Sequence, residues 1–420
     1  MAGEQKSGAL AGVKILDLTD ERAIYGAKLL ADLGAMVVRP EAEQGDPLRL
    51  RGPLDTRTGE SLWHAFFASS RSTLTVSPAD LKSGVISRLA VAADIVLTCP
   101  GAFGVDALEM KDVLADNPGL VCVDCSSFGS LGPWKDYLAP DLVAGALGGA
   151  VATTGDVDTP PLKGFGELNF MVSGVYVAIA ALGALFYQRA TGTGQQVQVP
   201  VHQSIASCLE QVFMFYWYSD VLGRPGQRVL PRRGALHWSN AYTVMKARGG
   251  SIMITPTPDF DSQLAWLIEE DAHQDLIDPR YSEPENLGLR ITRTMEILRT
   301  WVADKDVETL FHQAQTRHSP YGWVLPIERV ADNPQLQARN WFVDYRVADQ
   351  TVQGPGAPYH FSATPWALRD PESTDAGDDV LASVGWSRDE NVSKSTSPGG
   401  RPLEGVRILD FSHVLAGPFA

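Results

Sequence analysis

Short apolar runs alternate with amphipathic stretches along the first half of the chain. Residues 10–41 hold an apolar run at 13–16, a helical pattern that ends at Gly34, and a second apolar run at 36–38. Glycine commonly follows the last residue of a helix. Two apolar runs of this length with a helix between them predict a βαβ unit, whose strands are parallel.

The same alternation continues downstream. It indicates a doubly wound α/β layer, in which ligands usually bind beyond the carboxyl ends of the strands. The glycines after the first strand lack GxGxxG spacing, so a dinucleotide site is not supported. We expect strands at 71–76, 94–99, 120–128 and 196–201, and helices at 61–67, 78–91, 107–115, 138–155 and 202–218.

One segment, FMVSGVYVAIAALGALFY (170–187), is apolar throughout and close to the minimum length for crossing a bilayer. It is rich in Ala and Gly, and no second segment of this kind occurs. A helix that is apolar on all sides can also fill a large core. We therefore expect a buried central helix and no membrane partner.

The pattern changes after residue 222. Gly, Pro and Arg mark 223–240 as a linker. A hairpin pattern with its turn at Gly249–Gly250 follows, and then helices near 259–271, 289–303, 306–316 and 328–342. We expect a large α/β domain over 1–222, a small α+β domain over 241–327, and a return of the chain to the large domain over 328–392.

The opening segment is repeated near the end of the sequence. LEGVRILDFS (403–412) repeats LAGVKILDLT (10–19), and the period is far too long for a solenoid. We interpret 1–392 as one complete unit, 393–402 as a flexible Ser/Pro/Gly-rich linker, and 403–420 as the start of a second unit.

Composition narrows the class of protein and its partners. Apolar residues make up 44% and charged residues 20%, which is typical of a soluble globular protein. The net charge of −15 disfavours nucleic acid and anionic membranes, because both attract positive surfaces. The amino-terminal residues show no apolar signal core, so a cytoplasmic location is expected.

The chain has four cysteines. Cys122 and Cys125 have the CxxC spacing of redox motifs, but they belong to a buried-strand pattern, and we interpret them as reduced structural thiols. No second cysteine pair completes a zinc site, so we expect no metal.

Three arginines follow the second predicted strand closely: Arg39, Arg49 and Arg51. Guanidinium groups suit phosphate oxygens. From the spacing alone, solvated surface charge is the favoured interpretation.

Seven segments in order resemble the class III CoA-transferases, a family that includes formyl-CoA and carnitine CoA-transferases and α-methylacyl-CoA racemases. The resemblance covers nearly all of 10–392. It implies a Rossmann-like large domain, a smaller domain inserted before the chain returns to it, and interlocked dimers. The segments are LAGVKILDLT with KLLADLGAMVV, GDPLR (45–49), SSFGSLGPW (126–134), PDLVAGALGGAVATTG (140–155), RATGTGQQVQV (189–199), NPQLQARNWFV (333–343) and GAPYHFSATP (356–365).

The resemblance also implies covalent catalysis by an Asp, which attacks the acyl-CoA thioester. That Asp stands four residues before the glycine that opens the long helix. Here the glycine is Gly174 and the position is Phe170, which cannot attack a thioester. Glu167 is the nearest carboxylate, and it is either a displaced nucleophile or a surface or capping residue. Asp141 matches a position that the family often fills with Asp, and we expect it to cap a helix.

By the same resemblance, Arg39, Arg49, Ser69 and Arg71 are candidates for the phosphates of coenzyme A, which enters as a substrate. The family loop after the first strand resembles HVLAGPFA, present here at 413–420. The first unit has DERAIYGA instead. The first unit is therefore expected to have lost the chemistry and the second to have kept it, with its nucleophile after residue 420.

Three hypotheses follow. The protein is a tandem CoA-transferase that moves CoA between an acyl-CoA and a small carboxylic acid, with this unit degenerate. Alternatively, it is a racemase or another acyl-CoA enzyme on the same fold. Thirdly, this unit is a non-catalytic pseudo-subunit that supports a second CoA-transferase unit, in cis or as a homodimer.

Overall fold

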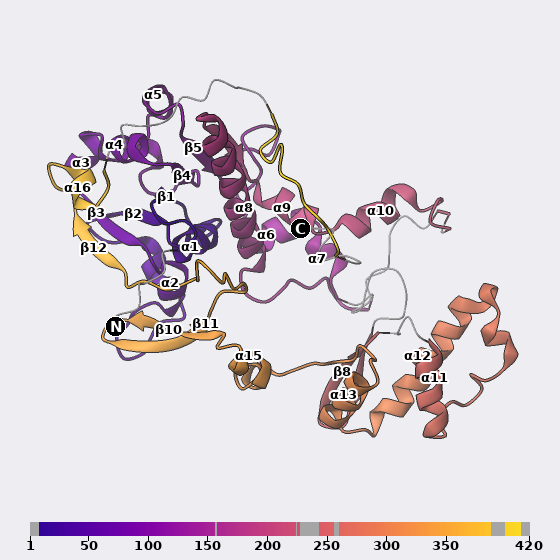
Figure 1. Cartoon of the computed structure of the whole chain (residues 1–420). Coiled ribbons are helices and arrows are strands. Elements are labelled where there is room, and N and C mark those ends of the chain that lie inside the picture. Colours follow the sequence, from indigo (N-terminus) through magenta and orange to yellow (C-terminus); the bar gives the residue numbers. More distant parts are fainter. Residues whose placement is uncertain are drawn as a thin grey trace. The chain divides into compact units, whose positions relative to one another are not determined.

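The computed structural model describes residues 8–155, 158–223, 225–226, 243–255, 260–387 and 400–412. Figure 1 traces the chain through its helices and strands. The chain divides into two compact units. Unit 1 comprises 1–148, 165–205 and 341–420, and unit 2 comprises 149–164 and 206–340. Most of the two expected linkers, 223–240 and 393–402, and the loop 413–420 lie outside the described residues.

Unit 1 contains a seven-stranded parallel sheet in the order β12-β3-β2-β1-β4-β5-β6. The order reverses between β1 and β4, which is the switch point where doubly wound sheets bind ligands. The predicted α/β class with a large parallel layer is thus confirmed. The strands are β1 (Lys14–Leu18), β2 (Met36–Ala42), β3 (Ser72–Val76), β4 (Ile95–Thr98), β5 (Val121–Asp124), β6 (Gln195–Gln198) and β12 (Glu372–Asp375).

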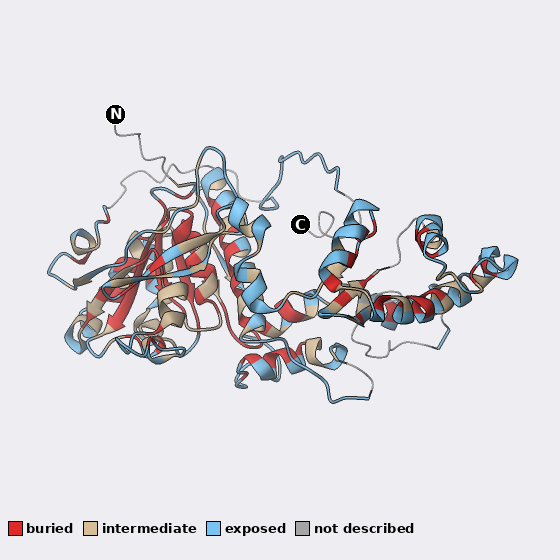
Figure 2. Cartoon of the chain, turned by 90° about the horizontal axis from the view of Figure 1, so that it is seen from below, coloured by how far each residue is buried: buried red, intermediate tan, exposed pale blue. Residues whose placement is uncertain are grey.

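Helices cover both faces of this sheet. On one face α4 (Val85–Ala92), α5 (Met110–Asp116) and α16 (Val380–Ser383) form a core with Leu16 and Leu18 of β1. Successive side chains of a strand alternate between faces, so Asp17 points to the other face. Figure 2 shows the buried residues concentrated in these strands.

The other face carries α1 (Ile24–Asp32) and α8 (Leu168–Thr191), which pack on the sheet and on each other. They cross at Gly26 and Gly174, where a Cβ added to Gly174 would lie 2.9 Å from the Gly26 nitrogen. Among the described residues, α8 is the helix long and apolar enough to cross a membrane. It is buried on one side only, since Ala181 is fully buried and Ile179 is 58% exposed.

Four predicted helices are each broken in two, among them 202–218, which forms α9 (Val201–Ser207) and α10 (Glu210–Tyr218). Residues 78–91 form α3 (Pro78–Lys82) and α4, separated by Gly84, whose φ is +78°. Residues 138–155 form α6 (Asp141–Leu147) and α7 (Ala150–Thr153), separated by Gly149, whose φ is +92°. A left-handed residue ends an α-helix, and glycine adopts that conformation at little cost. Residues 328–342 contain α14 (Ile327–Ala331) and α15 (Pro334–Ala338). The break lies just before Pro334, because proline favours the first position of a helix.

Unit 2 contains a three-stranded antiparallel sheet and helices, with a core around Trp266 and Tyr321. The predicted hairpin is present as β7 and β8, and Gly249 at its turn has a φ of +84°. The elements are α10 (Glu210–Tyr218), β7 (Thr243–Ala247), β8 (Gly250–Ile254), α11 (Phe260–Glu269), η3 (Pro279–Ser282), η4 (Pro284–Asn286), α12 (Leu287–Ala303), α13 (Val307–Thr316) and β9 (Gly322–Trp323).

The returning chain adds a two-stranded hairpin, β10 (Phe342–Val347) and β11 (Gln350–Pro355), to unit 1, and β10 packs against α2 (Leu62–Phe67). The remaining elements are η1 (Pro47–Leu50), η2 (Val105–Ala107) and α9 (Val201–Ser207).

Candidate functional site

A buried network of arginines and carboxylates lies on the α1 face of the sheet, where β1, β2 and β3 are neighbours. Its centre is Asp17, which is 1% exposed. One Asp17 oxygen accepts hydrogen bonds from the Thr19 hydroxyl at 2.6 Å and the Thr19 backbone N–H at 3.1 Å. The other oxygen pairs with Arg71 Nη1 and, at 3.2 Å, with Arg39 Nη1.

The network continues to the segment after β2. Arg39 donates through Nε and Nη2 to Asp46 Oδ2, each at 2.6 Å. Arg49 forms a two-pronged pair with Glu41, at 2.9 Å from Nε and 2.8 Å from Nη2. Asp46 begins η1 and accepts the Leu48 N–H at 2.8 Å, so the turn itself holds this carboxylate in place.

Electrostatics within the network follow from these pairs. Burial raises the pKa of Asp17, but the Arg39 and Arg71 guanidiniums outweigh it and hold the pKa below the usual value. Burial, together with Arg49 and Arg71, lowers the pKa of His64 to about 3. The network therefore keeps the Asp17 carboxylate ionised and the His64 imidazole neutral at ordinary pH.

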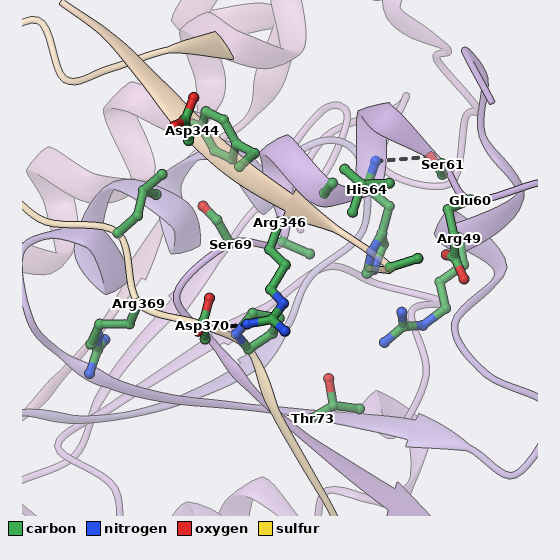
Figure 3. A pocket seen from close by; sticks show the side chains of 17 residues that line it. Arg49, Glu60, Ser61, His64, Ser69, Thr73, Asp344, Arg346, Arg369 and Asp370 are labelled. Carbon is green, nitrogen blue, oxygen red and sulfur yellow. Dashed lines mark hydrogen bonds and ion pairs between the residues drawn. The ribbon is translucent and has the colours of Figure 1, made fainter. Parts of the chain in front are cut away.

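A cavity of about 590 Å³ adjoins the network. Its walls come from α2, from β10 and from residues 368–371 of the returning chain (Figure 3). The volume is within the range of small-molecule sites, about 300–1,000 Å³. The Arg49 side chain is 41% exposed, and the Arg346 side chain, paired with Asp370 at 3.2 Å, is 61% exposed. Both line the cavity and retain access to solvent.

The structure brings together only part of the predicted phosphate-binding set. Arg49 and Ser69 line the cavity. Arg39 and Arg71 are 6% and 2% exposed, and their guanidiniums are occupied by Asp17 and Asp46. The Ser69 hydroxyl accepts a hydrogen bond from the buried Lys28 ammonium at 2.8 Å.

Sequence reasoning missed His64 and Arg346. His64 lies in a helix without a distinctive pattern, and Arg346 is more than two hundred residues away in sequence. No local signal in the chain joins these residues to Arg49.

Glu41, Asp46 and His64 place one potential metal-ligand atom each within 4.8 Å of one another. The carboxylates already accept hydrogen bonds from Arg39, Arg49 and two backbone N–H groups. A cation would have to displace a guanidinium and sit beside two others, which the local positive potential opposes. We therefore assign this cluster to the ion-pair network.

The amino-terminal end of α8 carries Phe170, the residue for which the resemblance to class III CoA-transferases implies an Asp. Phe170 is 5% exposed, and its backbone N–H donates to Asp141 Oδ1 at 3.0 Å. The other Asp141 oxygen accepts from the Asn169 amide at 2.9 Å. Asp141 thus caps a helix, as expected, but the helix is α8 and not α6, in which it lies. An aromatic ring, and no carboxylate, occupies position 170.

Glu167 immediately precedes α8, and both of its oxygens have partners. Oε1 pairs with Arg51 and Oε2 accepts from the Trp63 indole at 3.1 Å. Arg51 also stacks over the Trp63 ring at 4.8 Å and pairs with Glu21 at 3.3 Å. Two carboxylates and an indole thus surround one guanidinium, and this arrangement holds Glu167 in place.

At the switch point, the loop after β1 is tied to the loop after β4. Arg22 pairs with Asp20 and donates to the Pro100 carbonyl at 2.7 Å. The Arg22 carbonyl accepts from the Ser173 hydroxyl of α8 at 2.6 Å. Ser173 also donates to the Phe170 carbonyl at 2.9 Å, so position 170 lies near this loop.

The chain is similar in sequence to several proteins that are named as CoA-transferases. A succinate–glutarate CoA-transferase of Agrobacterium fabrum is 27% identical over 85% of this chain and 90% of its own length. A formyl-CoA:oxalate CoA-transferase of Streptomyces avermitilis is 26% identical over 80% and 85%. A probable CoA-transferase of Mycobacterium tuberculosis is 26% identical over 96% of this chain but only 51% of its own length.

Solved structures share the fold. A CAIB/BAIF family protein from Brucella suis superposes with a TM-score of 0.75 at 22% identity, over 90% of this chain and all of the other. The model of CoA-transferase family III matches residues 10–379, which is most of the chain. We conclude that the chain belongs to CoA-transferase family III.

Proposed function

We propose that the protein containing this unit transfers CoA between an acyl-CoA and a small carboxylic acid, and that this unit is a non-catalytic partner in the reaction. The observation that carries the proposal is the buried Phe170 ring at the position of the family's nucleophile. Transfer through an acyl-enzyme anhydride needs a carboxylate that can reach the thioester carbon.

Glu167 is a poor substitute for that nucleophile. One of its oxygens pairs with Arg51 and the other accepts a hydrogen bond from the Trp63 indole. To attack a thioester, Glu167 would have to break both contacts and leave the Arg51 guanidinium without this partner. Glu167 also lies almost one helical turn before position 170, which displaces it along the helix axis by about 4.5 Å. Reactive groups must be positioned to within a fraction of that distance.

A second unit of the same fold supplies the chemistry in this proposal. The repeat at 403–412 supports it, and so does the Mycobacterium tuberculosis relative, whose length is about twice the portion that this chain matches. Exposed apolar residues occur on α8 of unit 1, such as Ile179 at 58%, and on α10 of unit 2, such as Trp217 at 65%. Each of these two surfaces suits contact with a partner unit. The partner is a second unit in cis or a second copy.

Coenzyme A binding by this unit is a separate part of the proposal. Of the four candidates, Arg49 and Ser69 line the cavity and are proposed to meet phosphate oxygens, while Arg39 and Arg71 belong to the buried ionic network.

The activity of the chain tests the catalytic assignment. With the acyl-CoA and acid pairs named for its relatives, such as succinyl and glutaryl groups, we expect the 420-residue chain to show no CoA transfer above background. Phe170→Asp restores the family residue and is the gain-of-function control. Turnover by the wild-type chain that Glu167→Gln abolishes would instead make Glu167 the nucleophile. Exchange of the α-proton of an acyl-CoA with solvent deuterium would favour the racemase alternative.

Calorimetry tests the binding assignment. We expect CoA to bind weakly and with an affinity that falls as salt rises, because exposed charges are screened. Arg49→Ala should weaken binding about tenfold, the effect of losing roughly 1.4 kcal/mol from a charge-assisted contact. Arg329→Ala, in unit 2, is the matched control. Equal affinities of the Arg49 variant and the wild type would exclude Arg49 from the site.

A further inference from the structure

Two buried cysteines follow neighbouring strands at the same level of the sheet. Cys99 comes directly after β4 and Cys125 directly after β5, whose last residues Thr98 and Asp124 are register partners. The Cys125 N–H donates to the Thr98 carbonyl at 2.8 Å and continues the ladder. Neighbouring strands lie about 4.8 Å apart, within the range of about 4.4–6.8 Å between the Cα atoms of disulfides.

The two thiols also point to the same face. They follow the register partners Thr98 and Asp124 on parallel strands, so their side chains lie on the same face, and both residues are 0% exposed. The Cys125 thiol donates to the Arg22 carbonyl at 3.7 Å. Cys122 is three residues before Cys125, so strand alternation places it on the opposite face. The CxxC spacing in the sequence therefore does not identify the pair that the fold brings together.

We propose that Cys99 and Cys125 form a reversible disulfide when a hydroperoxide reaches them, giving a redox-sensitive link at the ligand-binding edge of the sheet. In the first step one thiol becomes a sulfenic acid and the peroxide is reduced to its alcohol, or to water. In the second step the other sulfur attacks the sulfenic sulfur. The S–S bond forms, the S–O bond breaks, and water leaves with the thiol proton.

The link would act on the loops that begin at these residues. Cys99 starts the loop that contains Pro100, and Cys125 starts the loop that leads to Phe128. Oxidation would join the two loops. It would also remove the hydrogen bond from the Cys125 thiol to the Arg22 carbonyl, while the hydrogen bond from the Ser173 hydroxyl to that carbonyl stays in place. The inference does not depend on the proposed function, because it concerns sulfurs that take no part in CoA transfer.

Burial of the cysteines sets the expected rate of their reaction with peroxide. It raises the pKa of Cys99 well above the usual value and that of Cys122 to about 12, so these two sulfurs rest as thiols. Reaction of Cys99 with peroxide is therefore slower than at the exposed Cys208. Once one sulfur of the pair is oxidised, the other lies at the end of the neighbouring strand and needs no access to solvent.

The test uses the full chain with Cys208→Ser, which removes the exposed thiol and intermolecular crosslinks. The folded protein is incubated with hydrogen peroxide, quenched, and alkylated in denaturant, and the peptides are mapped by mass spectrometry. We expect loss of two of the three thiols, a mass decrease of two hydrogen atoms, and one crosslink between the peptides of Cys99 and Cys125. Dithiothreitol should reverse all three changes.

Matched variants separate the possible outcomes. Adding Cys122→Ser should leave the crosslink intact, whereas adding Cys99→Ser or Cys125→Ser should abolish it. Circular dichroism before and after oxidation establishes that the reaction takes place in the folded state. A Cys122–Cys125 crosslink, retention of all three thiols after exposure that oxidises Cys208 fully in the parent chain, or a crosslink formed only in urea would overturn the proposal.

Discussion

At the residue scale, the chemistry of this unit is set by which charges have partners. Asp17, Arg39 and Arg71 are ionic and buried, yet each guanidinium faces a carboxylate. Removing one partner of such a buried pair typically costs about 3–5 kcal/mol, because the remaining charge is left without compensation. Exposed pairs such as Arg346–Asp370 contribute only about 0–1 kcal/mol. Of the residues proposed for phosphate binding, Arg49 is accordingly the one whose charge is exposed.

His64 makes the stability of the protein sensitive to acid. Its pKa is lowered to about 3 in the folded protein, first by burial and then by Arg49 and Arg71. Between pH 6.5 and about 3 the unfolded chain binds a proton that the folded protein excludes, so stability falls as the pH falls. One group contributes at most about 1.4 kcal/mol per pH unit. His64→Gln should flatten this part of the profile.

Urea denaturation at pH 7 and pH 5 measures the effect, with His312→Gln at an exposed helical position as the control. We expect the control to keep the wild-type difference between the two pH values. The same difference in the His64 variant would mean that other groups cause the acid sensitivity.

At the element scale, the pairing of α1 with α8 rests on two glycines in contact. A Cβ at position 174 would lie 2.8 Å from Tyr25 Cβ and 2.9 Å from the Gly26 nitrogen. Real atoms do not approach so closely, so the helices would have to separate. Overpacking of this kind costs about 1–3 kcal/mol.

Gly174→Ala should therefore lower the free energy of unfolding, measured by urea denaturation, despite the better helix propensity of alanine. Gly183 in the same helix is the matched control, since a Cβ there meets nothing within 4 Å. Gly183→Ala should raise stability by up to about 1 kcal/mol, the intrinsic preference of a helix for alanine. Equal effects at both positions would show that the close crossing does not limit packing.

At the scale of the whole molecule, the fold leaves many large apolar side chains exposed to solvent. The α10 helix presents several aromatic side chains to solvent, and Trp217 is 65% exposed. Apolar patches of this kind mark contact surfaces in soluble proteins. We predict that the chain associates with itself at micromolar concentration, measured by sedimentation velocity.

Trp217→Lys should weaken this association without lowering the thermal midpoint, because the side chain contributes little to its own unit's core. Ile327→Lys, at an 80% exposed position on α14, is the control for added charge. A monomer at all concentrations, or equal weakening by both variants, would argue against a partner at α10.

Much of the fold could be predicted from the chain because its signals are local. Apolar periodicity located β1–β5, α1 and the β7–β8 hairpin, and helix breaks were missed where a single glycine takes a positive φ, as at Gly84 and Gly149. The site was harder to predict. Arg39 and Arg71 looked like solvent-facing phosphate ligands in sequence, and only the register of three strands reveals that they face Asp17.

The repeated segment separates what the sequence determines from what the tertiary structure decides. Both copies form the same turn, with φ near +83° at Gly12 and +82° at Gly405, and both close a local loop in which a Ser or Thr donates to the preceding Asp. These contacts span only a few residues, so the sequence suffices to form them.

The strand between those two local structures forms only in the first copy. Residues 14–18 are buried between β2 and β4, whereas the matching residues near Ile408, 78% exposed, belong to no described strand. A strand needs neighbours for its backbone hydrogen bonds and a face of side chains to bury, and both come from distant parts of the chain. The sequence alone indicated the family, the aromatic residue at position 170 and the repeat, because each of them depends only on the order of residues along the chain. The tertiary structure decided which arginines are paired, which cysteines are neighbours and which surfaces stay exposed.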